Sequence, residues 1–77
     1  MEEKELTFGE KAVGLTFNPS NDPTVQEMKE AAARFIDICD KARQVSMSGE
    51  QKRLLSVAIT EAQTAQMWAV KGATWRD

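Results

Sequence analysis

The stretch Thr60–Ala73, with the sequence TEAQTAQMWAVKGA, decides the fold of this 77-residue chain. Alanine recurs along one side of it at helical spacing, and small side chains let a second helix approach closely. Another side carries Trp68, Lys71 and, one turn later, Trp75. A chain this small cannot bury two tryptophans around a lysine by itself, so this side predicts a contact surface.

The helix that contains this stretch is predicted to begin at Ser48, which has the spacing of a capping box with Gln51. Gly72 is expected to cap its C-terminal end. Its periodic apolar face is lined mainly by small residues: Leu55, Ala58, Ala62, Ala65, Ala69 and Gly72, with Ile59 beside them.

An earlier helix is predicted to begin at Pro23, with Asp22 as its N-cap, because proline is tolerated at the first helical position. Its apolar residues alternate three and four positions apart: Val25, Met28, Ala32, Phe35, Cys39 and Ala42, with Ile36 and Ile38 beside them. A short break at 46–49 separates the two helices. They are therefore expected to pack as an antiparallel two-helix hairpin, bulky face against small face.

The N-terminal segment 1–21 contains Gly9, Gly14 and Pro19 between short apolar stretches. Regular helix is not expected there, so this segment is predicted to be an irregular arm. The predicted fold class is all-α, with an arm at 1–21 and a helical hairpin at 22–77 within one domain.

The residue types that support catalysis are scarce. The chain has one cysteine and no histidine, which excludes intrachain disulfides and the common zinc clusters. It also lacks tyrosine, so the usual proton-transfer groups are missing. Cys39 lies on the apolar face and is expected to be a small buried hydrophobe. The sequence predicts no enzyme, no metal and no cofactor.

Charge and hydropathy limit which partners and which cellular compartment are expected for the protein. The net charge of −2 argues against binding to duplex nucleic acid, which needs a basic face. No apolar run approaches the roughly 18 residues that span a bilayer. The acidic start, Met1–Glu5, is unlike a signal peptide. We therefore expect a soluble cytoplasmic protein with no membrane partner.

Self-association is expected because a lone hairpin covers only one face of each helix. Six apolar residues stay off the predicted contact: Leu54, Val57, Met67, Trp68, Val70 and Trp75. Fully burying one such side chain gains about 1.5–3 kcal/mol. A symmetric homo-oligomer would bury many of them.

An anion site is expected where the start of the first helix meets the end of the second. The antiparallel arrangement brings the loop 18–21 and Lys29 to this end, near Trp68, Lys71, Trp75 and Arg76. Helix N-termini and lysines attract phosphate, and aromatic faces, including Phe17, stack on bases. Alternatively, the aromatic residues fill a core between subunits, which is the commoner role of such stripes. A second basic set at the turn, Lys41, Arg43, Lys52 and Arg53, is most simply a solvated helix end.

Two stretches resemble a known family: Lys11–Ser20 (KAVGLTFNPS) and Ala58–Lys71 (AITEAQTAQMWAVK), together with Lys29 between them. They are similar to the helical-hairpin domain of phage-encoded sponge proteins, the anti-CBASS and anti-Thoeris sponges. The similarity covers about residues 11–75. Proteins of this family sequester nucleotide second messengers of bacterial immunity without cleaving them.

The resemblance implies a homohexamer in the host-cell cytoplasm, with cyclic dinucleotides at subunit junctions and cyclic trinucleotides in separate pockets. It implies that Lys29 contacts a ligand phosphate and that a basic residue early in the second helix, Arg53 or alternatively Lys52, serves the trinucleotide pocket. In relatives an aromatic residue of the arm contacts the ligand; this chain has no tyrosine, and Phe17 is the nearest substitute. Thr60 and Thr64 match the helical pattern and either contact ligand or pack. The candidate ligand-binding residues are Phe17, Asn18, Lys29, Arg53, Thr60, Thr64, Trp68 and Lys71.

The alternative prediction is an oligomeric interaction module that docks a host or phage protein through its tryptophan surface. A nucleic-acid-binding hairpin is disfavoured by the acidic balance of the chain.

Overall fold

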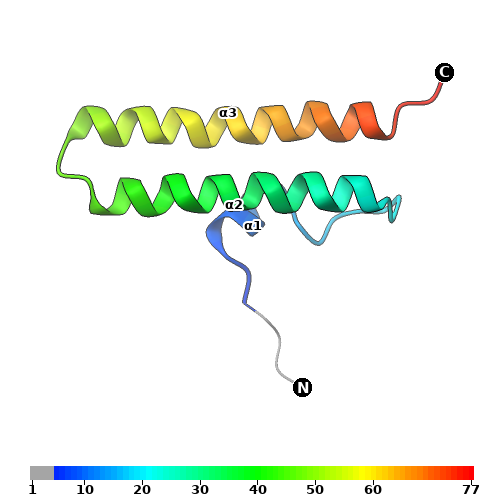
Figure 1. The fold of residues 1–77 in the computed structure, drawn as a ribbon, viewed down its shortest axis with the longest axis horizontal. Helices are drawn as coiled ribbons and strands as arrows, with labels where there is room; N and C mark the ends of the chain where they lie inside the picture. Colours follow the sequence, from blue (N-terminus) through cyan, green and yellow to red (C-terminus); the bar gives the residue numbers. More distant parts are fainter. Residues whose placement is uncertain (1–4) are drawn as a thin grey trace.

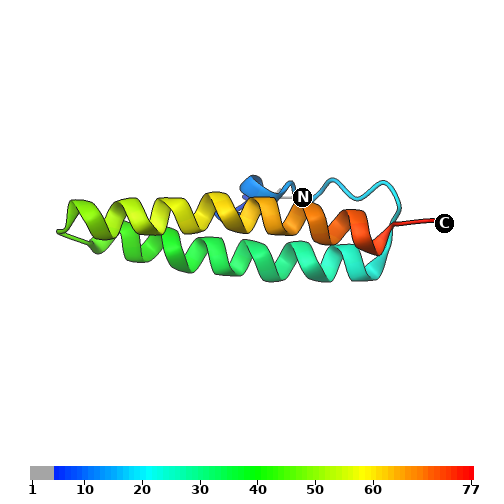
Figure 2. The same cartoon turned by 90° about the horizontal axis from the view of Figure 1, so that it is seen from above.

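The computed structural model describes residues 5–77, which form the helices α1 (Phe8–Val13), α2 (Pro23–Val45) and α3 (Gly49–Ala73) and contain no strand. α2 and α3 lie side by side and antiparallel, joined by a short turn (Figures 1 and 2). The all-α prediction is confirmed. None of the helices in this range is long and apolar enough to cross a membrane. Residues 1–4, which belong to the predicted arm and its acidic start, lie outside the described residues.

The two long helices begin where the sequence predicts. The Asp22 carboxylate accepts the N–H of Thr24 at 2.8 Å, and Pro23 occupies the first helical position. The Ser48 hydroxyl accepts the N–H of Gln51 at 3.1 Å. The predicted end of α3 is wrong. Gly72 lies inside the helix, and Thr74 is the C-cap residue, its N–H donating to the Val70 carbonyl at 3.0 Å.

The prediction of an entirely irregular arm is wrong, because α1 lies within it. Thr7 and Glu10 form a reciprocal capping box: the Glu10 N–H donates to the Thr7 hydroxyl, and the Thr7 N–H donates to the Glu10 carboxylate. Gly14 ends α1 in a left-handed conformation with φ of 63°, which glycine adopts without strain. An isolated helix of six residues is unstable in water, so its stability must come from packing.

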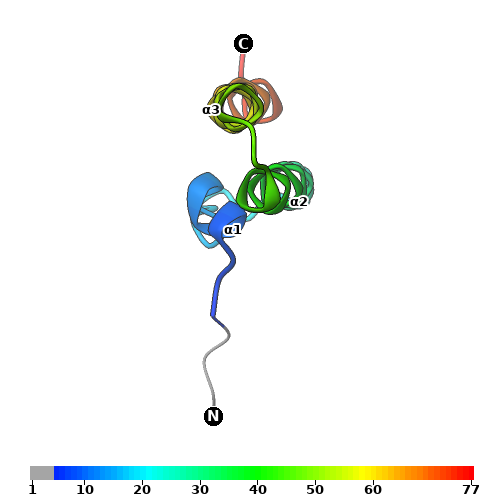
Figure 3. The ribbon, with the colours of Figure 1, turned by 90° about the vertical axis from the view of Figure 1, so that its left-hand side faces the viewer.

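That packing comes from α2, which lies between α1 and α3 when the molecule is viewed end-on (Figure 3). Gly9 sits so close to α2 that a Cβ added there would lie 2.1 Å from the Ala33 carbonyl oxygen. The Asp37 carboxylate accepts the N–H of Gly9 and the hydroxyl of Thr7, both at 2.7 Å. The missing side chain at residue 9 and the carboxylate at residue 37 together hold α1 on α2.

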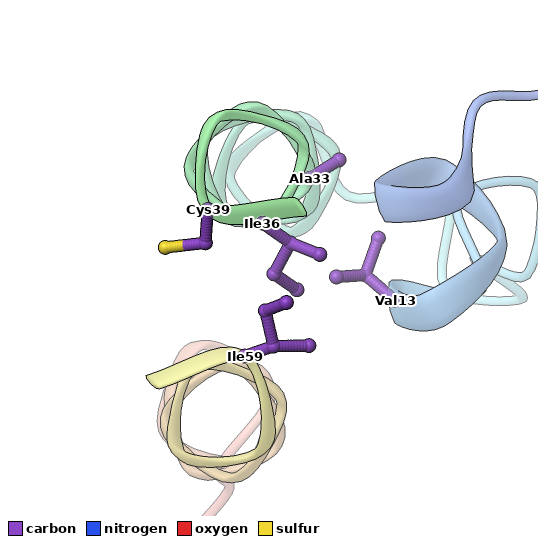
Figure 4. Packing of buried hydrophobic residues seen from close by; sticks show 5 residues of the cluster. All are labelled: Val13, Ala33, Ile36, Cys39 and Ile59. Atoms are coloured by element: carbon purple, nitrogen blue, oxygen red, sulfur yellow. The ribbon is translucent and has the colours of Figure 1, made fainter. Parts of the chain in front are cut away.

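The core joins all three helices and consists of Val13, Ala33, Ile36, Cys39 and Ile59 (Figure 4). Cys39 is buried as predicted. The predicted face of α2 is displaced by one residue over much of its length, since Ile36 is completely buried whereas Phe35 is 50% exposed. The reason is that α1 covers a second side of α2, so the buried residues of α2 include those that face α1 as well as those that face α3. On α3, Gln66 is buried and Ala65 is exposed, the reverse of the prediction.

Candidate ligand-binding groove

A groove of about 520 Å³ opens where the N-terminal segment, α2 and α3 meet. One wall comes from the end of α1 and the turn after it, which carry Lys11 and Phe17. Lys29 is contributed by α2, and Gln63 and Gln66 by α3. The apolar lining includes Val13, Met67 and Val70. Two cations, two amides and one aromatic ring therefore converge on one opening.

Lys29 is the most constrained of these groups, with only 6% of its surface exposed. Its ammonium donates to the Gly14 carbonyl at 3.0 Å and to the Phe17 carbonyl. It also lies 5.5 Å from the centroid of the Phe17 ring, within the range of a cation–π contact. An ammonium has three protons, of which the two carbonyls take two. Lys29 therefore holds the arm in place and still presents charge to the groove.

Gln66 is the second buried polar residue of the groove, 8% exposed. Its amide takes part in none of the side-chain hydrogen bonds found within residues 5–77. In the same range, every fully buried side-chain N or O atom has a partner, so the Gln66 amide atoms are not fully buried. The amide must therefore keep an opening to the groove that it lines. Its neighbour Gln63 differs, since that amide donates to the Ile59 carbonyl of its own helix at 3.4 Å. Lys29 and Gln66 form a polar layer in an otherwise apolar contact.

Three of the predicted ligand residues, Phe17, Asn18 and Lys29, lie together, lining an adjoining cavity of about 310 Å³. The Asn18 amide is used within its loop. Its Nδ2 donates to the Asp22 carbonyl at 3.1 Å, and its Oδ1 accepts the Ser20 hydroxyl at 2.9 Å. Asn18 thus shapes the loop that carries the Phe17 ring.

Three more predicted residues, Thr64, Trp68 and Lys71, line a separate shallow hollow on α3, together with Met67. The Lys71 ammonium lies 5.5 Å from the centroid of the Trp68 ring. The Thr64 hydroxyl donates to the carbonyl of Thr60 at 3.2 Å, which is a common local use of a helical threonine. Thr60 itself is exposed and lines neither the groove nor this hollow. Met67 lines both depressions and so connects them.

The end of the chain lies where the sequence predicts, beside the start of α2. Trp75 and Arg76 line a cavity of about 480 Å³ together with residues 20–23. The same prediction also placed Trp68 and Lys71 next to Lys29. Trp68 and Lys71 line the hollow on α3, which Lys29 does not line, and Met67 lines both this hollow and the groove that contains Lys29.

Arg53 belongs to the first turns of α3, which follow the turn after α2 (Figure 1), and it does not line the groove. It forms an exposed ion pair with Glu50, with hydrogen bonds of 2.9 and 2.7 Å. This hydrogen bond lowers the pKa of Glu50 and raises the pKa of Arg53 above its ordinary value. The structure therefore does not bring Arg53 together with the other candidate residues of the same chain.

Three polar residues of the groove were not among the predicted ligand residues: Lys11, Gln63 and Gln66. A signal for Gln66 was present, because it is four residues from both Ala62 and Val70 and so shares their helical face. The run of alanines favoured the neighbouring register through Ala65. Lys11 carried no signal, because the arm was not expected to be helical.

The fold is an all-helical hairpin with a buried ammonium and an open amide at the junction of its helices, which is a candidate ligand site. The model of the Acb2/Tad1 hairpin-domain family matches residues 10–74, and the chain belongs to this family. It is the family of cyclic-oligonucleotide sponges, anti-CBASS and anti-Thoeris, so the resemblance seen in the sequence is confirmed. It is a family of binding domains and not a known enzyme family. No curated protein and no solved structure matches the chain.

Proposed function

We propose that this protein binds cyclic di- or trinucleotide immune messengers and holds them intact, thereby counteracting bacterial anti-phage signalling. The observation that carries the proposal is the groove, where Lys11, Lys29 and the Phe17 ring converge in a member of a sponge family. Ammonium groups suit the phosphates of such a ligand, and an aromatic ring suits its bases. Sequestration acts by mass action and needs no catalytic group.

The working unit in this proposal is a homo-oligomer, a hexamer by analogy with the family, in the cytoplasm of the host cell. Large apolar side chains remain exposed on the single chain, including Leu54 (53%), Val57 (47%) and Trp68 (66%). Burying them between copies would stabilise the assembly. A junction between copies would also double the number of cations and rings that face one ligand.

Thermal unfolding with a panel of cyclic nucleotides tests the proposal. The panel contains cyclic di-AMP, cyclic di-GMP, cyclic GMP–AMP and cyclic tri-AMP. At a ligand concentration one hundred times Kd, binding stabilises the folded state by about 2.7 kcal/mol. We expect at least one ligand to raise Tm and to be recovered unchanged after denaturation. No shift with any ligand, or recovery of a converted nucleotide, would contradict the proposal.

A second candidate function, docking of a host or phage protein, is favoured by the exposure of Trp68 (66%) and Trp75 (65%). Exposed tryptophans often anchor protein interfaces. Affinity capture from infected cells would support this function if it recovered one stoichiometric protein and no nucleotide. Trp68→Ala and Trp75→Ala should then lose that protein.

A further inference from the structure

We propose that Gln66 is a specificity-determining residue of the groove, and that its side-chain amide hydrogen-bonds the edge of an adenine in the bound messenger. This inference rests on the proposed function and adds the base that the groove prefers. Gln66 is 8% exposed, lines the groove, and has no hydrogen bond to a described residue.

The Gln66 amide is available to a ligand. No side-chain N or O atom of residues 5–77 is both fully buried and unpartnered, so this amide meets the solvent that fills the groove although most of the residue is buried. Its neighbours on the same face of α3, Ala62 and Val70, are apolar. A ligand that hydrogen-bonds the amide takes the place of this solvent, and the groove is the side from which a ligand can reach it.

The donor and acceptor of the amide point to a base rather than a phosphate. A carboxamide presents an N–H donor beside a carbonyl acceptor. A phosphate would satisfy the donor and leave the carbonyl oxygen facing an anion. Lys11 and Lys29 already supply cations for phosphate in the same groove. A base edge that carries its own donor beside an acceptor satisfies both atoms of the amide.

Adenine fits this requirement better than guanine does. The N6 amino group of adenine lies between two ring acceptors, N7 and N1, so either edge can pair with an amide. The major-groove edge of guanine presents two acceptors, O6 and N7, which suit arginine or lysine instead. Guanine can pair with an amide only through its Watson–Crick edge. The Phe17 ring and the Met67 side chain line the same groove and can contact the face of the base.

Titration calorimetry with cyclic di-AMP and cyclic di-GMP tests this inference on the full-length protein. Gln66→Met keeps the length of the side chain and removes both hydrogen-bonding atoms. Gln66→Glu keeps the shape and an acceptor oxygen but loses the donor. Gln51→Met is the matched control, since Gln51 is an exposed glutamine in the first turn of the same helix. Each variant is also melted without ligand.

For the wild-type protein we expect tighter binding of cyclic di-AMP than of cyclic di-GMP. Gln66→Met should weaken cyclic di-AMP binding by about tenfold or more, reduce the preference, and leave Tm unchanged or higher. Gln66→Glu should also weaken cyclic di-AMP binding. Gln51→Met should bind cyclic di-AMP as tightly as the wild type does.

Three results would overturn the inference. In the first, the wild type binds and Gln66→Met binds cyclic di-AMP equally well, which leaves the proposed function intact. In the second, both Gln66 variants lose Tm, which makes the residue structural. In the third, the wild type binds no cyclic nucleotide, which removes the proposed function as well.

Discussion

The Asp37 carboxylate accepts the backbone N–H of Gly9 at 2.7 Å, so a side chain of α2 caps the first turn of α1. The second oxygen of the same carboxylate accepts the Thr7 hydroxyl. This contact lies at one end of α1, and the groove residues Lys11 and Val13 lie further along the same helix. The attachment of α1 to α2 therefore sets the position of one groove wall.

Gly9→Ala should detach α1 from α2. The new Cβ would lie 2.1 Å from the Ala33 carbonyl oxygen, and this backbone atom cannot move aside without displacing a helix. We expect a loss of about 1–3 kcal/mol in the free energy of unfolding, as is typical of overpacking. Urea unfolding followed by circular dichroism measures the loss, and ligand affinity should fall with it.

Gly72→Ala is the matched control for that experiment. Gly72 lies inside α3, and a Cβ there would meet no atom within 4 Å. The same substitution should therefore stabilise the protein by about 0.5–1 kcal/mol, through helix propensity and the entropy of the unfolded chain. Equal stability changes for the two variants would show that α1 does not pack against α2 in solution.

Lys29→Met and Lys11→Met should distinguish two roles of positive charge in the groove: holding the arm in place and binding the ligand. Lys29 is buried and bonded to the carbonyls of the arm, whereas Lys11 is exposed. We expect Lys29→Met to lower both Tm and ligand affinity, because charged hydrogen bonds contribute about 1.5–3 kcal/mol each.

For Lys11→Met, the free energy of unfolding should stay within about 0.5 kcal/mol of the wild-type value. Its effect on affinity should shrink as salt is raised, since exposed charges are screened. Calorimetry at low and high salt makes the comparison. Identical behaviour of the two variants would refute the distinction.

Val57→Glu should disrupt self-association. Val57 is 47% exposed, and Leu54, one turn before it, is 53% exposed. Burying a charge in an interface that needs these side chains is costly without a partner. Sedimentation velocity at low micromolar concentration should show an oligomer for the wild type and smaller species for Val57→Glu. A wild-type protein that sediments as a folded monomer would contradict the oligomeric proposal.

Arg53→Ala should weaken cyclic trinucleotide binding, if Arg53 serves that pocket as the family resemblance implies. It should leave dinucleotide binding unchanged, because Arg53 does not line the groove of its own chain. Its loss should barely change stability, since the pair with Glu50 is exposed. Parallel titrations with cyclic tri-AMP and cyclic di-AMP compare the two sites. A loss of dinucleotide affinity alone would place Arg53 in the other site.

The pH dependence of the Glu50–Arg53 pair has a definite sign. The hydrogen bond from Arg53 lowers the pKa of Glu50 in the folded state. Any stability from the pair is therefore present above the unfolded pKa of glutamate, about 4.3, and is lost as the pH falls through the folded pKa. The small stability difference between the wild type and Arg53→Ala should thus disappear in acid. A difference that grows on acidification would contradict this assignment.

The starts of the long helices could be predicted because their signals are local. Asp22 and Ser48 accept N–H groups within three residues, and Pro23 needs no N–H partner at the first helical position, so their roles can be inferred without a tertiary model. The position of Lys29 near Phe17 followed from the resemblance and the antiparallel arrangement. What the sequence did not reveal depends on contacts between distant segments.

The packing of α1 on α2 is the main example of such contacts. Its Thr7–Glu10 capping box is visible in the sequence, but six residues do not form a stable helix alone. The deciding contacts come from Ala33 and Asp37, more than twenty residues later. Because α1 was not foreseen, the buried side of α2 was placed on Phe35 instead of Ile36.

The polar layer of Lys29 and Gln66 has a consequence for the alignment of the long helices. Ile36, seven residues after Lys29, packs close to Ile59, seven residues before Gln66 (Figure 4). Sliding the helices by one heptad would place the Lys29 side chain against Ile59 instead of Gln66. Such a buried polar position can fix helix register. A change at Lys29 that alters ligand choice would therefore also loosen the pairing of the helices, which limits how freely the groove can adapt to a new messenger.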